Sequence, residues 1–305
     1  MNLTAIIHTR NSAATLPRAL ESVRWAGEVL VVDMESEDGT AALAAAHGAR
    51  VIAIPRAPRV DGVRNAAAAE ASHPWVLVLD SDEYLADDAG DAVARLVQAQ
   101  GTAHDAFAVP RFNYVGGQLL RGGSWYPDFQ IRLFRRGTVA WSDTHHQPPR
   151  VVTGPHRLLH LEPPGCLHIH HAHHATLLDM ARRQLEYAAT SAYDADPERF
   201  AFADYVAEAY AALAERRDPD ADGDLSHALA LLLAWDAVVR GLTHWERLDP
   251  RPPLGALAAL PVAARTLPAA RARTRRWLDR YDLRPLARRA RRRLLRTLRW
   301  PGPGR

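Results

Sequence analysis

Four short apolar runs alternate with helix-like segments along the first eighty residues of the chain. The runs are LTAIIHT (3–9), EVLVVD (28–33), RVIAIP (50–55) and WVLVLD (75–80). Strands that are apolar on both faces are typical of parallel strands buried between helices. The intervening segments 15–23, 40–48 and 63–71 have helical spacing, with Asp38 and Gly48 as the expected start and stop of the second. This order predicts an α/β protein with a doubly wound, mostly parallel sheet.

Beyond about residue 100 the pattern changes to hairpins and then to helices. Paired strands are expected in 106–120, around Gly116 and Gly117, and in 130–141, around Gly137. The expected helices are 177–193, 202–215 and 227–239. The predicted organisation is an α/β domain over 1–175, a helical extension packed on it over 176–245, a proline-rich linker over 246–270 and a basic amphipathic tail over 271–305.

Positive charge is concentrated at the end of the chain. Residues 271–305 hold fourteen arginines against Asp279 and Asp282, whereas the whole chain has a net charge of +3. Leucine and alanine recur at helical spacing between Leu283 and Leu298, with arginine on the other face. A basic amphipathic helix is typical of an interfacial membrane anchor, so we expect 271–300 to bind an anionic membrane surface. A solvated tail and, less favoured, nucleic acid are the alternatives.

Composition indicates a cytoplasmic protein that is either soluble or peripheral at the inner face of the cell membrane. Cys166 is the single cysteine, which excludes a disulfide framework within the chain. The first residues do not read as a secretory signal. No apolar run approaches the ~18 residues that cross a bilayer, and the longest, 253–264, is broken by Pro261.

Polar residues collect where the predicted parallel strands end. These ends carry Thr9, Arg10, Asn11, Asp33, Arg56, Asp80, Ser81 and Asp82. Ligands of open α/β sheets bind outside these carboxyl ends. The chain has neither GxGxxG nor GxxxxGK[ST], so a bound diphosphate would need another source of positive charge. A Mg²⁺ or Mn²⁺ ion held by Asp82 could supply it, because these ions take one or two carboxylates together with phosphate oxygens.

Five ordered motifs resemble the family 2 glycosyltransferases of the GT-A fold. They are IIHTRNS…ALESV, VVDMESEDGT, VRNAA, VLDSDEY and, further on, GGSWYPDFQIRLFRRG (122–137). The last is similar to a signature of the lipopolysaccharide-core glucosyltransferase subgroup, as is CLHIHH (166–171). The resemblance covers about residues 1–195, and it implies a GT-A, Rossmann-like sheet with a C-terminal helical extension.

The resemblance implies a role for each matching residue. The implied donor-binding residues are Thr9, Arg10, Asn11, Asp33, Arg64, Asp80 and Ser81. Among these, Asp33 would bind the base and Asp80 the ribose. Asp82 and His168 would hold Mg²⁺ or Mn²⁺, and Asp128 would face the sugar or the acceptor. Glu83 either supports the site or is simply solvated, and Trp125 and Tyr126 would either stack on a sugar or pack under their loop.

The sequence departs from the family where a general base is expected. The family has a glutamate where this chain has Gln147, which follows His145 and His146 and cannot accept a proton at useful pH. Asp128 or Asp143 could take over as the base, or one of the two histidines could. Otherwise the site is impaired or suited to an unusual acceptor.

These observations predict a metal-dependent glycosyltransferase, and the resemblance implies that the reaction is inverting. It would move a sugar from a nucleotide-sugar donor, a UDP-sugar foremost, to a glycan, lipid-linked or other hydroxyl acceptor in envelope polysaccharide or glycoconjugate synthesis. Gln147 keeps a non-catalytic sugar-nucleotide binder as an alternative. A sugar-nucleotide pyrophosphorylase is less favoured, since HTRNSAATL lacks the glycine-rich loop of those enzymes.

Overall fold

The computed structural model describes residues 1–56, 61–123, 125–142, 148–163, 165, 167–192 and 200–248. Its strands are β1 (Leu3–Thr9), β2 (Glu28–Asp33), β3 (Arg50–Ala53), β4 (Trp75–Asp80), β5 (Glu83–Leu85), β6 (Ala106–Val115), β7 (Gln118–Leu119), β8 (Asp128–Arg135), β9 (Val139–Ala140), β10 (Arg150–Val151), β11 (Leu158–His160) and β12 (Ile169–His174). Its helices are α1 (Leu16–Ser22), α2 (Thr40–Ala46), α3 (Asp61–Ala69), α4 (Ala89–Gln100), α5 (Leu177–Ser191), α6 (Phe202–Arg216) and α7 (Pro219–Glu246), with a 3-10 turn at Pro155–Arg157.

The large sheet has the strand order β3-β2-β1-β4-β8-β6-β12-β5. Its first four strands are parallel, as the sequence predicts, and β8 then runs antiparallel to both β4 and β6. The hairpin predicted around Gly116 and Gly117 is confirmed by the antiparallel pair β6–β7. The strand pair predicted around Gly137 is wrong, because β9 pairs with β10 and not with β8. The backbone N–H groups of Arg135 and Arg136 donate to the carbonyls of Asp105 and Pro74 instead.

Side chains of β1 and β4 alternate between two apolar cores, one on each face of the sheet. Leu3, Ile7 and Leu77 pack with α1 and α4 on one face. Ile6 and Val78 pack with α3 on the other face. Burial on both faces explains why these strands read as continuous apolar runs, since neither face meets water.

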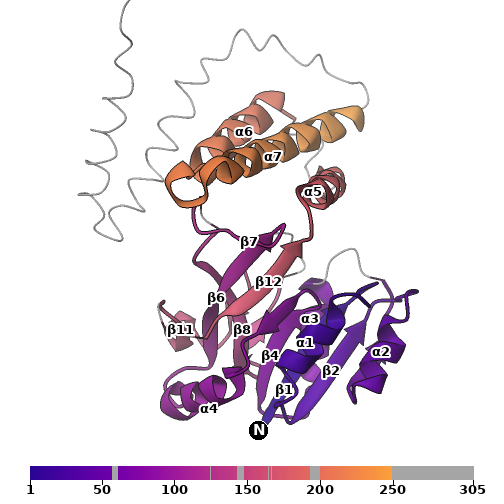
Figure 1. The fold of residues 1–305 in the computed structure, drawn as a ribbon, viewed down its shortest axis with the longest axis vertical. Coiled ribbons are helices and arrows are strands. Elements are labelled where there is room, and N and C mark those ends of the chain that lie inside the picture. The colour runs from indigo at the N-terminus through magenta and orange to yellow at the C-terminus, as the bar shows by residue number, and fades with distance from the viewer. Residues whose placement is uncertain are drawn as a thin grey trace, which may run out of the picture.

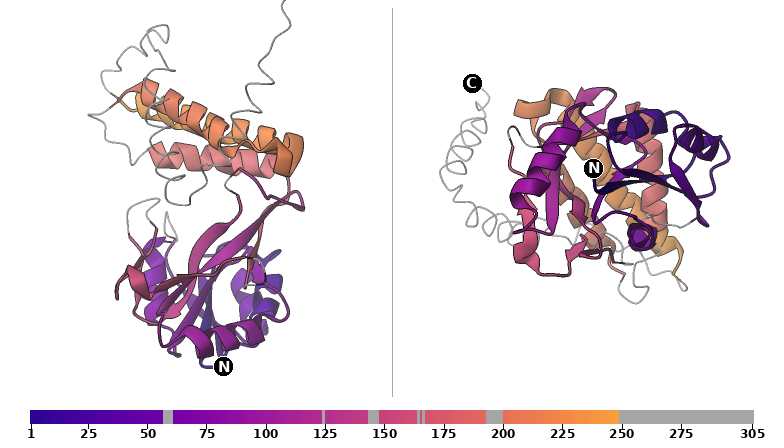
Figure 2. Two further views of the ribbon diagram at one scale, coloured as in Figure 1. Left: turned by 90° about the vertical axis from the view of Figure 1, so that its left-hand side faces the viewer. Right: turned by 90° about the horizontal axis from the view of Figure 1, so that it is seen from below.

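The three C-terminal helices form a layer at the end of the molecule opposite the N-terminus, so that β1 runs toward them (Figure 1, Figure 2). A third core joins this layer to the sheet, in which Val115 and Leu120 meet Met180 and Leu229. The three predicted helices are confirmed, although α7 begins at Pro219, eight residues earlier than expected, and is kinked at Gly223, whose φ of 57° is not helical. By length and composition alone, α7 could cross a membrane. The sequence analysis did not find it, because its apolar residues do not form one unbroken run.

Two smaller expectations meet different outcomes. The cap position of α2 is Gly39, and Asp38 instead accepts hydrogen bonds from the backbone and hydroxyl of Thr40. The domain limits stay a prediction; α5 starts at Leu177, two residues beyond the proposed limit at 175. Most of the predicted linker and the whole basic tail fall in 249–305, outside the described residues.

Candidate functional site

The strand register brings the predicted polar residues to one edge of the sheet. Thr9 pairs with Asp33 across β1 and β2, and His8 pairs with Asp80 across β1 and β4. Ser81 continues this edge, because its backbone N–H donates to the carbonyl of His8. The carboxyl ends of three parallel strands therefore meet in one place, as the sequence predicts.

The loop after β1 is fixed against the loop after β2 by Asn11. This residue has a left-handed backbone (φ 48°), its N–H donates to Ser36 Oγ at 2.8 Å, and its Oδ1 accepts from the N–H of Glu37 at 2.8 Å. Asp33 lies between the loops, with 4% of its surface exposed. One of its oxygens accepts from the N–H of Ser36, whereas the buried Oδ1 has no hydrogen-bond partner among the described residues. A buried acceptor without a donor is costly, so this oxygen is suited to a ligand N–H.

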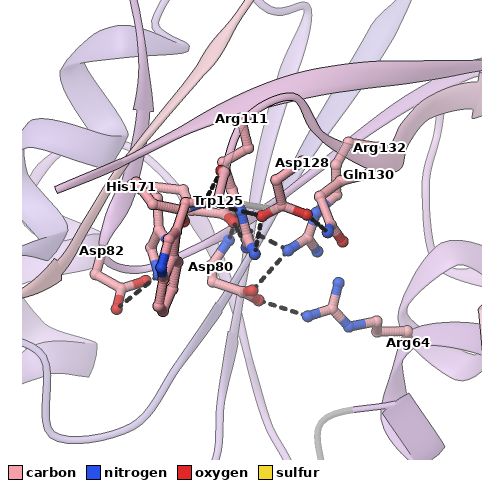
Figure 3. Close-up of polar contacts among 11 residues, drawn as sticks. Arg64, Asp80, Asp82, Arg111, Trp125, Asp128, Gln130, Arg132 and His171 are labelled. Atoms are coloured by element: carbon pink, nitrogen blue, oxygen red, sulfur yellow. Dashed lines mark hydrogen bonds and ion pairs between the residues drawn. The ribbon is translucent and has the colours of Figure 1, made fainter. Parts of the chain in front are cut away.

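Asp80 is held by two buried arginines from different elements (Figure 3). Arg64 of α3 donates to one carboxylate oxygen at 2.7 Å, and Arg132 of β8 donates to the other at 2.7 Å. Both guanidinium groups lie almost wholly out of water, with 6% and 4% of their side chains exposed. Asp80 therefore balances positive charge that would otherwise be buried at the sheet edge.

Glu83 is completely buried, so the alternative that it is simply solvated is wrong. Its carboxylate accepts from Arg111 at 2.7 Å, from Arg132 at 3.1 Å and from the N–H of Asp80 at 3.0 Å. Burial and the nearby charge of Asp80 raise the pKa of Glu83, while Arg111 and His171 oppose that rise. Glu83 thereby fixes the turn that presents the two aspartates before it.

Asp128, a candidate base, lies at the start of β8 with both oxygens engaged (Figure 3). Arg111 donates to Oδ2 through two nitrogens at 2.9 and 2.7 Å, Asn113 donates to the same oxygen at 3.0 Å, and Gln130 donates to Oδ1 at 2.7 Å. Burial raises the pKa of this carboxyl, but Arg111 and these hydrogen bonds outweigh it and hold the pKa below its usual value. Such a carboxylate is a weak proton acceptor, so its role as base stays a prediction that its contacts do not favour.

The amide of Asn113 determines which nitrogen of His171 carries the proton. Its Nδ2 donates to Asp128 and to the carbonyl of Trp125 at 3.1 Å, and both of those groups are acceptors only. Its Oδ1 must then accept from Nδ1 of His171, 2.8 Å away. In a neutral ring this leaves the lone pair of Nε2 directed at Asp82 Oδ2, across 3.6 Å. Two electron-pair donors that face each other at this distance can share a cation.

His168, predicted as a metal ligand, lies on the other face of this part of the chain. Alternate residues point to opposite faces of a strand, so His168 and His170 point away from the face that carries His171. The ring of His168 stacks on Phe112 with centroids 4.2 Å apart, and its Nε2 lies 2.9 Å from the hydroxyl of Tyr126. Its metal role stays a prediction, and the histidine that the structure brings beside Asp82 is His171.

His8 is a further buried group at this edge, with 3% of its surface exposed. Burial, and then the positive charge of Arg64, lower the pKa of its imidazole to about 3. His8 is therefore neutral at physiological pH and adds no charge beneath the Arg64–Asp80 pair.

Residues 4–147 match the family described as "Glycosyl transferase family 2". These residues form a family 2 glycosyl transferase domain. The match spans β1 to β9 and so includes the edge that carries Thr9, Asp33, Asp80 and Asp82. Together with the parallel half of the sheet, it confirms the α/β, GT-A architecture predicted from the sequence.

Relatives of known sequence match over part of their length. An uncharacterized glycosyltransferase of Rickettsia bellii is 36% identical over 99 residues, which is 32% of this chain and 33% of the relative. The succinoglycan biosynthesis protein ExoO of Rhizobium meliloti is 36% identical over 129 residues, 39% of this chain and 36% of the relative. The matches thus span about a third of the length of these relatives. Among solved structures, S. aureus TarS 1-349 in complex with UDP-GlcNAc has 15% identity and a TM-score of 0.43, covering 64% of this chain and 68% of that one.

Four residues of the candidate site were missed by the sequence analysis: Arg111, Asn113, Arg132 and His171. The sequence does hold a pattern that could have revealed the first three. Along β6, Arg111 and Asn113 alternate with less polar residues, and along β8 the same alternation places Arg132 in register with Asp128 and Gln130. Polar residues at period two inside an apolar strand indicate a polar face. The remaining base candidates, Asp143, His145 and His146, lie outside the described residues, as does Gln147 at the position where the family has its base.

Proposed function

We propose that the chain is a metal-dependent, inverting glycosyltransferase that moves a sugar from a nucleotide-sugar donor to a hydroxyl acceptor. The observation that carries the proposal is the facing pair Asp82 and His171 at the edge where β1, β2 and β4 end. Membership of residues 4–147 in the glycosyl transferase family supports it.

The donor set fits Mg²⁺ or Mn²⁺. One carboxylate oxygen and one imidazole nitrogen are too few for a closed structural site, and the described residues hold no cluster of three or more such ligands. These ions, however, commonly take few protein ligands and complete their shell with water and phosphate oxygens. When bound, the ion would stabilise negative charge on the leaving diphosphate. Asp82 and His171 would hold it, and Asn113 would orient the imidazole.

The donor base would lie against Asp33. Its buried Oδ1 can accept a hydrogen bond from a ring N–H such as that of uracil, which supports a UDP-sugar as the first donor to test. Thr9, Arg10, Asn11 and Ser81 line or adjoin the same edge. Asp80 would reach a ribose only with its free lone pairs, because Arg64 and Arg132 already occupy both oxygens.

The acceptor hydroxyl must lose a proton during transfer. Asp128 and the segment that includes Asp143, His145, His146 and Gln147 remain the candidates for this step, and the low pKa of Asp128 favours the segment. The acceptor class we propose is a glycan or lipid-linked hydroxyl in envelope polysaccharide synthesis, because the relative from Rhizobium meliloti is named for succinoglycan biosynthesis. Anionic lipid bound by 271–300 would place the enzyme at the inner face of the membrane.

Thermal-shift measurements with UDP-, GDP- and dTDP-sugars, each with and without Mn²⁺, test this proposal. We expect one nucleotide class to raise the unfolding temperature more with Mn²⁺ than without it. Asp82→Asn should abolish the metal-dependent part, whereas Asp87→Asn, an exposed carboxylate in the following loop, should leave it unchanged. No stabilisation by any donor would refute the proposal. Release of the nucleotide over time would then separate an enzyme from a non-catalytic binder.

A further inference from the structure

Exposed apolar side chains are concentrated on the C-terminal helices. Nine large apolar residues are exposed in the described part of the chain, and seven of them lie on α5, α6 and α7. They are Leu177, Leu178, Leu185, Tyr187, Tyr210, Leu231 and Trp235. Single exposed apolar residues are ordinary, but a group on one structural layer indicates an interaction surface.

Helix α7 has an apolar outer face opposite its packed face. Leu231 and Trp235 are one helical turn apart and are each 52% exposed. On the other side, Leu229, Ala237 and His244 are buried against the neighbouring helices. The outer face, defined here as Ala228, Leu231, Trp235, Val238 and Leu242, continues for four turns at positions that share one side of the helix, with Val238 and Leu242 half-buried.

The packed face of α7 suits a helix that lies on a membrane better than one that crosses it. Asp222, just before the non-helical Gly223, is buried and accepts from the backbone N–H groups of Arg121 and Gly122 at 2.8 and 2.7 Å. Farther along, Arg240 pairs with Asp236 at 3.0 Å and with Glu208 of α6 at 2.6 Å. Charged groups tied into the protein on one face, with an apolar face opposite, give the arrangement of an interfacial helix.

We propose that the outer face of α7 inserts into the headgroup region of an anionic bilayer. The chain beyond α7 carries fourteen arginines in its last 35 residues, and such a charge is attracted to anionic lipid. Apolar insertion by Leu231 and Trp235 then adds to electrostatic attraction, and stable membrane attachment generally takes two such signals. Trp235 is of the residue type enriched at the level of the headgroups.

Helix α5 supports the choice of a charged lipid surface over a second protein chain. Leu178 and Leu185 are exposed on one side of α5, and exposed Arg182 lies between them on that side. Apolar side chains interleaved with arginine match an anionic lipid surface, whereas the core of a protein interface is depleted of charge.

Flotation of the full chain with vesicles tests the proposal. Vesicles are phosphatidylcholine alone or mixed about equally with phosphatidylglycerol. We expect binding to the anionic vesicles only, weakened about tenfold or more in L231S/W235S, since each change removes an inserted apolar side chain. The control V152S changes a residue that is 48% exposed on the sheet half, and it should bind like the unchanged chain. Trp235→Leu keeps apolar area and should retain most of the binding.

Three outcomes would overturn the proposal. The first is equal binding of anionic vesicles by L231S/W235S and the unchanged chain. The second is a dimer in light scattering that L231S/W235S dissociates, which would show that a second copy covers the face. The third is stronger vesicle binding after removal of 271–305, which would show that the chain's own tail covers it. An unfolding temperature of L231S/W235S equal to that of the unchanged chain excludes misfolding. No sugar-nucleotide is present in the flotation experiment, so its result is independent of the proposed glycosyl transfer.

Discussion

Nε2 of His171 lies 3.6 Å from Oδ2 of Asp82, and the amide of Asn113 forces the proton of a neutral His171 onto the opposite ring nitrogen. The amide is itself fixed, since its nitrogen donates to Asp128 and to a carbonyl. A chain of three hydrogen-bonded side chains thus directs one nitrogen lone pair toward one carboxylate. This relationship is the physical basis for placing a divalent cation between them.

His171→Ala should remove the effect of Mn²⁺ on donor binding. The matched controls are His170→Ala and His168→Ala, which change imidazoles on the opposite face. Isothermal titration of UDP with and without Mn²⁺ measures the difference; we expect metal-dependent affinity to fall more than about tenfold for His171→Ala only. If His168→Ala were the variant that lost metal dependence, the ligand assigned from the sequence would be correct and our assignment of His171 wrong.

Asn113→Ala should weaken metal binding without removing a ligand. Loss of the oxygen that accepts from Nδ1 lets the imidazole turn and change tautomer, and such outer partners typically contribute about 10–100-fold in affinity. The unfolding temperature without metal should also fall, because Asp128 loses one donor. Titration of Mn²⁺ in the presence of UDP measures the first effect. Unchanged Mn²⁺ affinity in a folded Asn113→Ala would show that His171 is not oriented in this way.

The sequence predicted the edge where the parallel strands end better than the rest of the candidate site, for a physical reason. Thr9, Asp33 and Asp80 follow strands whose apolar runs are a local signal, and parallel strands place their ends together. Arg111 and Arg132 belong to β6 and β8, whose register is set by pairing between distant segments and includes an irregularity after Phe107. No local pattern gives that register.

The choice between His168 and His171 shows the same limit. The histidine-rich run alternates faces, and its sequence does not say which face meets Asp82. Pairing of β12 between β5 and β6 decides it, by setting His171 beside Glu83 and Asn113 and His170 beside Tyr84. One residue of slip would have exchanged the two faces.

His8 should make the fold less stable in mild acid. Its pKa is about 3 in the folded chain against 6.5 for an ordinary histidine, so between these values the unfolded chain binds a proton that the folded chain does not. Stability must therefore fall as pH drops through 6.5, by about 2 kcal/mol from this group at pH 5. Urea unfolding of His8→Met and the unchanged chain at several pH values measures this: the variant should gain relative stability as pH falls from 7 to 5. Parallel pH profiles would contradict it.

Asp222 should couple the helical layer to the loop that leads to Trp125 and Asp128. Its two oxygens accept from the N–H groups of Arg121 and Gly122, and its surface is 6% exposed. Asp222→Ala leaves the buried N–H of Gly122 and the part-buried N–H of Arg121 without this acceptor, so we expect a loss of about 1–3 kcal/mol in the free energy of unfolding, measured with urea. Asp224→Ala, an exposed acid on the same helix, should cost less than about 0.5 kcal/mol. Equal effects of the two changes would show that the contact with the loop contributes nothing.

Gly123 should be the least replaceable glycine of that loop. Its φ of 55° is in the left-handed region, and a Cβ there would overlap the carbonyl of Arg216, a backbone group that cannot turn aside. Gly116 is a matched control, because its φ is 58° but a Cβ would meet nothing nearer than the Ala175 carbonyl at 3.9 Å. Gly116→Ala should therefore cost only the conformational term of about 1–2 kcal/mol, and Gly123→Ala about 3 kcal/mol or more. Urea unfolding measures both losses of free energy, and equal losses would mean that the Arg216 carbonyl at the end of α6 does not contact Gly123 closely.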